Sequence, residues 1–227
     1  MTEQALFNTT HLAGGVLFHP TNTHRRALAF GEIDLPLAVD NRNYCTPVED
    51  QGTHPWCAAY TAAAFAENVM WRRDGFIQEV EVQPLYEWAK KNDYAPAEDG
   101  TTLDAVCEAL KAKGVFGENT STRLIYGEAQ MKQAVHRYGC ALGAFNITSE
   151  WYNLAGGRGE NITGANNCDR LGGHAVLVVG YNAGGVWVEN SWGTGWGAAG
   201  FGFLEWQAFH EQFLYGSVLT RCLDGFK

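Results

Sequence analysis

The residues of this sequence that could do chemistry are Cys57, His174 and Asn190. A cysteine attacks a carbon atom as its thiolate, and the positive end of a helix dipole favours that form. Cys57 follows Pro55 at the expected start of an alanine-rich helix, so its place in the chain suits a nucleophile. A buried and inert cysteine is nevertheless the commoner fate of this residue type. Cys57 therefore needs support from elsewhere in the sequence.

His174 and Asn190 give that support because they lie at opposite ends of an expected β-hairpin. They are 190 − 174 = 16 residues apart, with the turn-rich stretch 182–185 between them. Antiparallel pairing would bring the imidazole and the amide together. An amide oxygen that accepts the imidazole N–H fixes the tautomer of the ring and leaves the other nitrogen to a thiol. The alternative is a surface histidine beside a hairpin, with no chemical role.

Three sequence motifs then agree in order and local spacing with a known family. The first joins Gln51 to Cys57, which follows it by 57 − 51 = 6 positions. The second is the apolar run 174–181, which begins with the histidine, and the third is the Asn-Ser-Trp-Gly run 190–193. In these motifs the sequence resembles the papain family of cysteine peptidases, in the form found in many bacterial relatives. The resemblance covers most of the chain beyond about residue 35.

The resemblance implies a mechanism and a role for each residue. Cys57 would be the nucleophile, His174 its base, Asn190 the group that orients the base, and Gln51 a donor to the oxyanion. An endopeptidase of this kind hydrolyses a protein or peptide substrate through a thioester acyl-enzyme. No metal or organic cofactor is implied. The six cysteines are scattered without the paired spacing of a metal site, which favours reduced thiols.

Four further residues are candidates for substrate binding by the same resemblance: Gly100, Gly173, Trp192 and Trp56. Gly100 lies in a run similar to the cleft wall of the family, and Gly173 corresponds to a position beside its main specificity pocket. Trp192 is expected to shield the hydrogen bond between the amide and the imidazole from water, which would strengthen that bond. Pro55 and Trp56 stand where many relatives carry small residues, so we expect a stiffer and bulkier entrance to the cleft.

Two other classes of function remain open. The same triad supports deamidation of protein amides or transglutaminase-like acyl transfer to an amine, and a shared fold does not distinguish these reactions from peptide hydrolysis. The chain could also be a catalytically silent binding module of papain-like fold, in which Pro55 and Trp56 block the cleft.

Composition and charge argue against several partners and locations. The chain has 227 residues, of which 46% are hydrophobic, enough for a packed core. Its net charge of -9 and the lack of any run of Lys or Arg argue against nucleic acid as a partner. No apolar stretch is long enough to span a membrane, and residues 1–20 lack the apolar core of a signal peptide. We therefore expect a cytoplasmic protein, or an effector-type protein exported without a classical signal peptide.

The expected elements divide the chain into a helical half and a β-rich half. Periodicity and end signals predict helices over 57–73, 84–91, 103–113 and 128–137. Short apolar segments between Gly and Asn residues predict strands over 141–147, 174–181, 186–189, 201–206 and 213–219. Thr101 and Asp104 have the spacing of a capping box at the start of the third helix.

We expect an α+β protein with the two-lobe fold of the family. A helical lobe would span about residues 41–122 and a β-barrel-like lobe about residues 123–222, with the active-site cleft between them. Together they would form a catalytic domain over residues 35–227. Residues 1–34 lack sustained periodicity and are expected to form an N-terminal arm or lid, which would restrain activity if it occludes the cleft.

Overall fold

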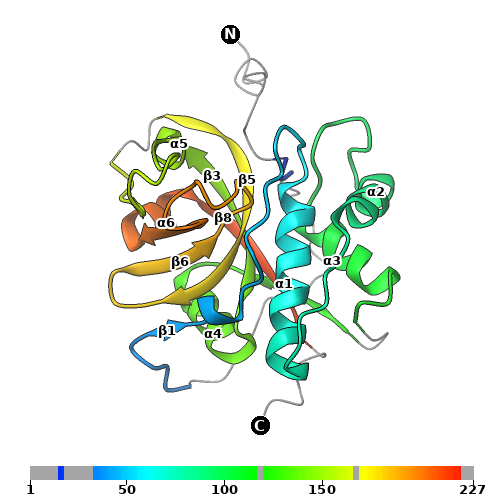
Figure 1. Cartoon of the computed structure of the whole chain (residues 1–227), viewed down its shortest axis with the longest axis horizontal. Coiled ribbons are helices and arrows are strands. Elements are labelled where there is room, and N and C mark those ends of the chain that lie inside the picture. Colours follow the sequence, from blue (N-terminus) through cyan, green and yellow to red (C-terminus); the bar gives the residue numbers. More distant parts are fainter. Residues whose placement is uncertain (1–14, 18–32, 117–119, 166–168, 221–227) are drawn as a thin grey trace.

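The computed structural model of the chain describes residues 15–17, 33–116, 120–165 and 169–220. They form a lobe of helices and a lobe built on a sheet, on the two sides of a central helix (Figure 1). The predicted N-terminal arm, residues 1–34, lies outside the described residues except for 15–17, 33 and 34.

Three helices build the first lobe: α1 (Cys57–Asp74), α2 (Val82–Asn92) and α3 (Leu103–Ala112). α1 is rich in alanine, the best helix former, which also lets neighbouring elements approach its backbone closely. Most of its residues are buried, and it packs against both other helices and against the sheet. It ends at Gly75, which takes the left-handed conformation with φ 73° and donates its N–H to the carbonyl of Trp71. Figure 1 accordingly shows α1 in the middle of the molecule.

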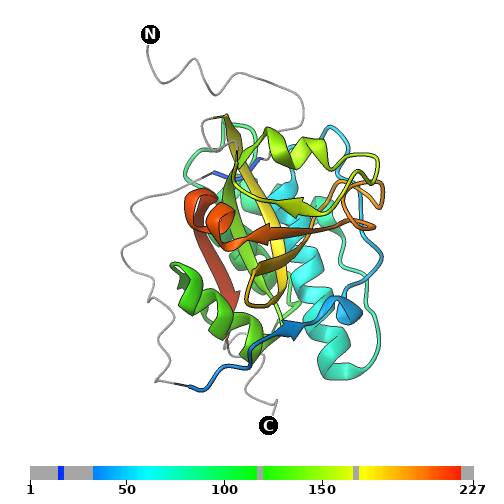
Figure 2. The same ribbon diagram turned by 90° about the vertical axis from the view of Figure 1, so that its left-hand side faces the viewer.

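The second lobe is one sheet, which has eight strands among the described residues: β1 (Val39–Asp40), β2 (Thr122–Ile125), β3 (Ala141–Thr148), β4 (Asn161–Ile162), β5 (Arg170–Tyr181), β6 (Gly185–Glu189), β7 (Phe201–Glu205) and β8 (Phe213–Leu219). The strand order is β2-β8-β3-β5-β6-β7-β4, and β1 pairs with β5 outside this path. Figure 2 shows these strands with α1 behind them. The expected barrel-like lobe needs correction, because closure requires the two end strands to pair. Here β2 pairs with β8 and the two-residue β4 with β7, so the sheet is open.

The described residues form four further helical elements: η2 (Arg42–Tyr44), α4 (Glu128–Tyr138), α5 (Ser149–Asn153) and α6 (Trp206–Gln212). Of these, α4, α5 and α6 pack against the sheet. The sequence pattern extended a strand through Trp206, but a helix begins there. Trp206 and Phe209 are three residues apart, and their ring centroids are 5.4 Å apart. That spacing suits a helix, and burial of Phe209 against the sheet favours it over further strand.

α3 begins at Leu103, as predicted, but its capping residue differs from the prediction by one position. Thr102, and not Thr101, is the N-cap, and its side chain accepts the N–H of Ala105 at 3.0 Å. Thr101 is engaged elsewhere, because its N–H donates to the carbonyl of Gly15 and its own carbonyl accepts the N–H of Leu17. The backbone of Thr101 is therefore paired with the N-terminal segment, and Thr102 caps the helix.

The predicted hairpin is present and brings the chemistry-bearing residues to one place. β5 and β6 pair in antiparallel fashion, with Leu177 opposite Glu189 and an irregularity between Val178 and Gly180. β5 also packs against α1. The central part of β5, the end of β6 and the wall of α1 therefore converge, so the site lies where the two lobes meet.

Candidate active site

The imidazole of His174 and the amide of Asn190 meet beside the β5–β6 pair. His174 Nε2 lies 2.7 Å from Asn190 Oδ1, and both residues are buried. The same oxygen accepts the backbone N–H of Ser191 at 2.8 Å. Because Oδ1 is thereby an acceptor, the imidazole donates its Nε2 proton. His174 Nδ1 has no hydrogen-bond partner among the described residues, so this nitrogen is the one left to exchange a proton with a thiol.

Cys57 is the first residue of α1 and is fully buried. Its sulfur lies within hydrogen-bonding reach of the backbone N–H of Ala175, the residue after His174. The nucleophile candidate and the histidine strand are thus in contact across the boundary of the lobes. The backbone N–H groups of Cys57 and Ala58 also point toward the sulfur, as expected at the positive end of a helix.

Gln51 is held beside this pair by three hydrogen bonds. Its backbone N–H donates to the carbonyl of Ser191 at 2.8 Å, and its Oε1 accepts the Ser191 hydroxyl at 2.6 Å. Its Nε2 donates to the carbonyl of His54 at 2.9 Å. An amide nitrogen carries two hydrogens, so one remains for an oxyanion. Ser191 therefore links the segment that carries Gln51 to the segment that carries Asn190.

The pKa values of the thiol and the imidazole both shift toward the neutral forms. Burial raises the pKa of Cys57 to about 12, although the backbone N–H groups around the sulfur oppose that rise. Burial lowers the pKa of His174 to about 4, against the effect of its hydrogen bond to Asn190. Both shifts favour a neutral thiol and a neutral imidazole over an ion pair in this form of the protein.

Trp192 stacks on His174, with ring centroids 4.7 Å apart, and Tyr152 stacks on Trp192 at 5.0 Å. Trp196 meets the edge of Trp192 at 5.9 Å. This aromatic cover lies over the buried hydrogen bond between His174 and Asn190, which is where the sequence placed Trp192 as a shield. Exclusion of water lowers the local dielectric and strengthens that bond.

Trp56 does not stand free at the entrance. Its indole is stacked between His54, at 4.3 Å, and Tyr86, at 5.0 Å. The three rings form a ladder on the helical lobe, which holds the bulky residue before Cys57 in one place. The ladder accounts for how a tryptophan is accommodated beside the nucleophile.

The described N-terminal segment, residues 15–17, lies in the groove between Gly100 and Gly173. Val16 pairs in parallel with Thr101, as two backbone hydrogen bonds of 2.6 and 2.9 Å show. A Cβ atom on Gly100 would lie 2.0 Å from the Gly15 carbonyl oxygen, and one on Gly173 would lie 2.5 Å from the Val16 carbonyl oxygen. Both glycines therefore make room for this backbone, and Figure 1 shows the dark blue segment beside the upper end of α1.

The same segment reaches the nucleophile. A Cβ atom on Gly15 would lie 2.1 Å from the carbonyl oxygen of Pro55, and the Gly15 backbone N–H lies within hydrogen-bonding reach of the Cys57 sulfur. Val16 is itself buried. Residues 15–17 thus occupy the groove that leads to Cys57 and contribute to the burial that shifts its pKa.

The site contains functional contacts that the sequence did not indicate. Ser191 lies inside the asparagine motif, so its position was visible, but its hydroxyl bond to Gln51 was not. Tyr152 and Tyr86 carry no signal in the sequence pattern, since each reaches the site only through the folding of a distant segment. Among the described residues, no group of three His, Cys, Asp or Glu could hold a metal ion.

Two predictions on composition can be compared with the structure. Cys45, Cys57, Cys107 and Cys140 form no disulfide bond with one another, and the other two cysteines lie outside the described residues. Among the helices of the described residues, none is long and apolar enough to cross a membrane.

Comparison with known proteins identifies the family. The profile described as "Papain family cysteine protease" matches residues 75–211, more than half of the chain. The chain belongs to the papain family. The matched range includes His174 and Asn190 and begins after Cys57, so the nucleophile rests on the structure and the sequence motif. Cathepsin L2 of Homo sapiens is 27% identical over 206 residues, covering 74% of this chain and 60% of that protein. Papain of Carica papaya is 25% identical over 208 residues, covering 79% and 57%.

Solved structures of the family share the fold. Xylellain, a cysteine protease from Xylella fastidiosa, has a TM-score of 0.72 at 16% identity, covering 92% of this chain and 96% of that chain. Procathepsin B of Trypanosoma congolense has a TM-score of 0.69 at 18% identity, covering 92% and 86%. The predicted α+β class and two-lobe fold are therefore confirmed. The chain spans about 60% of the length of the curated papain-family relatives that it matches.

Proposed function

We propose that this papain-family chain is a cysteine endopeptidase that cuts protein or peptide substrates. The observation that carries the proposal is the 2.7 Å contact between His174 Nε2 and Asn190 Oδ1. It fixes the imidazole so that Nδ1 is the nitrogen left to face the thiol. The contact of the Cys57 sulfur with the Ala175 N–H supports the same assignment.

The reaction follows from these positions. The thiol proton of Cys57 passes to His174 Nδ1, and the thiolate attacks the carbonyl carbon of the substrate. The developing oxyanion takes hydrogen bonds from the backbone N–H of Cys57 and the side-chain amide of Gln51. His174 then returns its proton to the leaving amine as the C–N bond breaks, which leaves a thioester on Cys57. A water molecule, deprotonated by His174, attacks the thioester and releases the acid.

The N-terminal segment restrains this activity in the proposal. With residues 15–17 in the groove, burial favours the neutral thiol and imidazole, and a substrate has no access to Gly100 or Gly173. Withdrawal of the segment returns both groups to solvent, which lowers the pKa of Cys57 and raises that of His174. Gly100, Gly173, Trp56 and Trp192 then line the substrate cleft.

A denatured protein substrate tests the proposal, with products read by mass spectrometry. The chain and a variant lacking residues 1–32 are compared with Cys57→Ser versions of each. Backbone cuts that vanish with Cys57→Ser are the expected result. Cys107→Ala is the matched control, because it removes a buried thiol from α3 and should leave the cuts in place. Conversion of side-chain amides to acids, or new cross-links, without cuts would instead assign the chain to deamidation or acyl transfer.

Burial of Cys57 also favours a second candidate, a binding module without turnover. A cysteine with no exposed surface and a pKa near 12 is unreactive as it stands. Labelling by a thiol-directed epoxide separates the two. The peptidase proposal expects Cys57 to be labelled once residues 1–32 are removed, and labelling to be lost in His174→Ala. A truncated, folded chain that resists the epoxide would support the binding module.

A further inference from the structure

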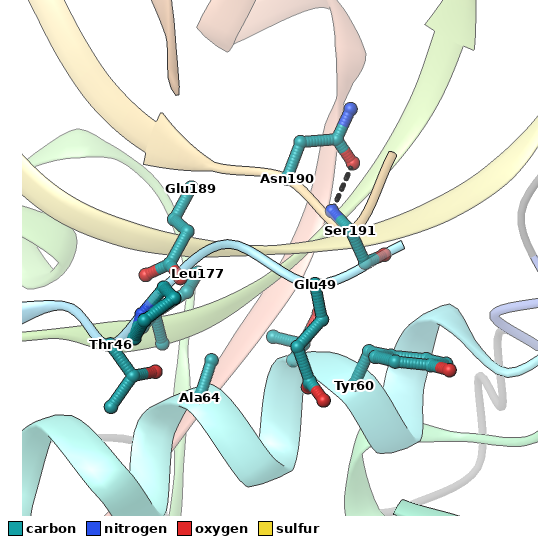
Figure 3. A pocket seen from close by; sticks show the side chains of 10 residues that line it. Thr46, Glu49, Tyr60, Ala64, Leu177, Glu189, Asn190 and Ser191 are labelled. Carbon is teal, nitrogen blue, oxygen red and sulfur yellow. Dashed lines mark hydrogen bonds between the residues drawn. The ribbon is translucent and has the colours of Figure 1, made fainter. Parts of the chain in front are cut away.

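A small cavity lies behind Asn190, on the side away from the imidazole. It has a volume of about 10 Å³, which is room for about one water molecule. Its walls come from the segment before Gln51, from α1, from β5 and from the end of β6, and the residues are Thr46, Pro47, Glu49, Tyr60, Thr61, Ala64, Leu177, Glu189, Asn190 and Ser191. Figure 3 shows the Glu189 carboxyl pointing toward Thr46, while the Asn190 amide points the other way.

Glu189 is a buried carboxyl without a cationic partner. It is 5% exposed, and its Oε2 has no hydrogen-bond partner among the described residues. Within the described part of the chain, no Lys, Arg or His forms an ion pair with Glu189, Glu67 or Glu49. A buried ionised carboxylate needs donors or a counter-charge, and this one has little of either. The Cys45 thiol lies near it but donates to the carbonyl of Asn41 at 3.9 Å.

The titratable groups around the cavity are nearly all acids. The loop before Gln51 contributes Cys45 and Glu49, and α1 contributes Tyr60 and Glu67, with Glu79 farther away. The strands on either side of Glu189 place apolar residues opposite it, Leu177 on β5 and Phe201 on β7. Burial first, and then the charges of Glu67 and Glu49, raise the pKa of Glu189 to about 7. Burial, with the charges of Glu67 and Glu79, also raises the pKa of Glu49.

Glu67 differs from Glu189 because its oxygens are satisfied. Its Oε2 accepts the Thr46 hydroxyl at 2.6 Å and its Oε1 accepts the Val80 N–H at 2.8 Å. These donors stabilise the ionised form of Glu67. They oppose the effect of burial, which raises the pKa of Glu67. Glu189 Oε2 has no donor of this kind among the described residues, so Glu189 depends more than Glu67 on keeping its proton.

The cavity is walled by the two segments that carry the catalytic machinery. Glu49 lies two residues before Gln51, and Glu189 directly precedes Asn190. The segments are joined by the Gln51 to Ser191 hydrogen bonds and by the Gly193 N–H, which donates to the Glu49 carbonyl at 3.0 Å. Charge on both glutamates would push these segments apart at the point where they must stay in register.

We propose that Glu189 is a positioning residue that works as its neutral acid, keeping the segment of Asn190 packed against the segment of Gln51, and that its ionisation loosens the site. This role rests on the proposed peptidase activity for its catalytic readout only. The stability readout does not depend on that activity. Loss of the Glu189 proton adds a second buried charge next to Glu67, and like charges at close range are unfavourable.

The sign of the stability effect follows from the raised pKa. A carboxyl whose pKa is higher in the folded than in the unfolded protein binds more protons when folded. Its contribution is therefore full below the unfolded value and is lost as pH rises through about 7. The folded protein should lose stability between about pH 5 and pH 8, and the catalytic site should loosen over the upper part of that range.

Thermal unfolding of the Cys57→Ser chain tests the role without interference from self-cleavage. The expected result is a Tm that falls by about 3 °C or more from pH 6 to pH 8, and a fall at most half as large in Glu189→Gln, which keeps the shape without the charge. Glu211→Gln, on the exposed face of α6, is the matched control and should behave like the parent. Equal pH dependence in parent and Glu189→Gln would overturn the proposal.

The catalytic readout uses the active chain without residues 1–32. The proposal expects the alkaline fall of kcat/KM to begin near pH 7 and to move to higher pH in Glu189→Gln. If Glu189→Gln does not fold, Glu49→Gln replaces it. Removing the neighbouring charge must also move the alkaline fall of kcat/KM to higher pH. A chain with no peptidase activity but with the Tm effect would remove the proposed function and leave the role of Glu189 intact. A higher Tm in potassium chloride than in choline chloride at pH 8 would indicate that a cation, and not a proton, neutralises Glu189. That result would overturn the proposal.

Discussion

The end of β6 separates two buried groups of titratable residues, and their burial has different sources. In front of Asn190, Cys57 is covered in part by residues 15–17, which also lie against Gly173, the residue before His174, and belong to a segment outside the two lobes. Behind it, Glu189 is covered by α1 and by the loop before Gln51, both parts of the folded lobes. In the proposed function, burial by residues 15–17 is a reversible control on reactivity. Burial by elements of the lobes has no such release, so titration of Glu189 acts first on stability.

The pKa shifts in the two places have the same origin and opposite consequences. Desolvation raises the pKa of Cys57 and lowers that of His174, which disfavours the ion pair that the proposed reaction needs. Desolvation raises the pKa of Glu189, which keeps a neutral acid where a charge would do harm. Substitutions in front of Asn190 should therefore leave the pH dependence of stability unchanged, whereas ionisation of Glu189 behind it should loosen the front side as well.

Asn190→Ala should give the largest effect on the front side. Removing the amide deletes the 2.7 Å hydrogen bond that sets the tautomer and angle of His174. We expect kcat/KM of the chain without residues 1–32 to fall on the order of a hundredfold, since general acid–base catalysis by a positioned group contributes that much or more. Asn43→Ala, at an exposed position in η2, is the control and should leave kcat/KM unchanged.

A fall in kcat/KM of less than about threefold for Asn190→Ala would contradict this assignment. It would indicate that stacking by Trp192 orients His174 instead. The pH dependence of Tm is the second readout for this variant. It should stay that of the parent, because the Asn190 amide points away from Glu189 and the acidic groups keep their hydrogen bonds. A changed pH dependence would show that the two sides are not separable.

Gly15→Ala should release the front side without truncation. A Cβ atom at this position would lie 2.1 Å from the carbonyl oxygen of Pro55 and 2.7 Å from the Cα of Gly100, so the segment cannot keep its place in the groove. We expect the rate of alkylation of Cys57 by iodoacetamide to rise about tenfold or more, because the thiol regains solvent and its pKa falls. Gly52→Ala, in the loop that carries Pro55, is the control, and its rate of alkylation should stay that of the parent. Nothing lies within 4 Å of a Cβ atom at Gly52, although its φ of 57° carries some strain.

A synthetic peptide covering residues 10–22 should reverse the effect of Gly15→Ala in a dose-dependent way. Unchanged alkylation in Gly15→Ala, with an equally slow rate in the chain without residues 1–32, would contradict the role of the segment. The burial of Cys57 would then belong to the core, as that of Glu189 does, and the contrast between the two sides would disappear.

The sequence predicted the parts of the site that depend on local patterns and left out those that depend on tertiary contacts. The helix start at Cys57 and the hairpin that joins His174 to Asn190 follow from periodicity and turn residues, which are properties of short segments. The N-cap of α3 was misplaced by one residue because Thr101 pairs with a segment far away in the chain. No local pattern contains that information.

The open sheet and the grouping of acids around Glu189 could not be predicted from the sequence for the same reason. Whether β2 and β4 meet is decided by the lengths and tilt of all strands together. Glu189 ends an apolar strand, and no sequence pattern marks it. Its lack of a cationic neighbour depends on which side chains of α1 and of the loop before Gln51 face it. Short motifs predict the residues in front of Asn190, whereas the grouping of acids around Glu189 depends on tertiary contacts.

Ser191→Ala should give the smallest effect, and it acts on both sides at once. The Ser191 hydroxyl donates to Gln51 Oε1 at 2.6 Å, and both residues are buried. Its loss leaves that oxygen without this donor, at a cost of about 1–3 kcal/mol. We expect kcat/KM to fall by about threefold to tenfold and the alkaline fall to begin at lower pH, because the two segments have lost one of their links. Ser191→Thr restores a hydroxyl and should recover part of the rate. Identical pH profiles for Ser191→Ala and the parent would mean that the backbone hydrogen bonds alone hold the segments in register, and that Glu189 acts on stability without reaching Gln51.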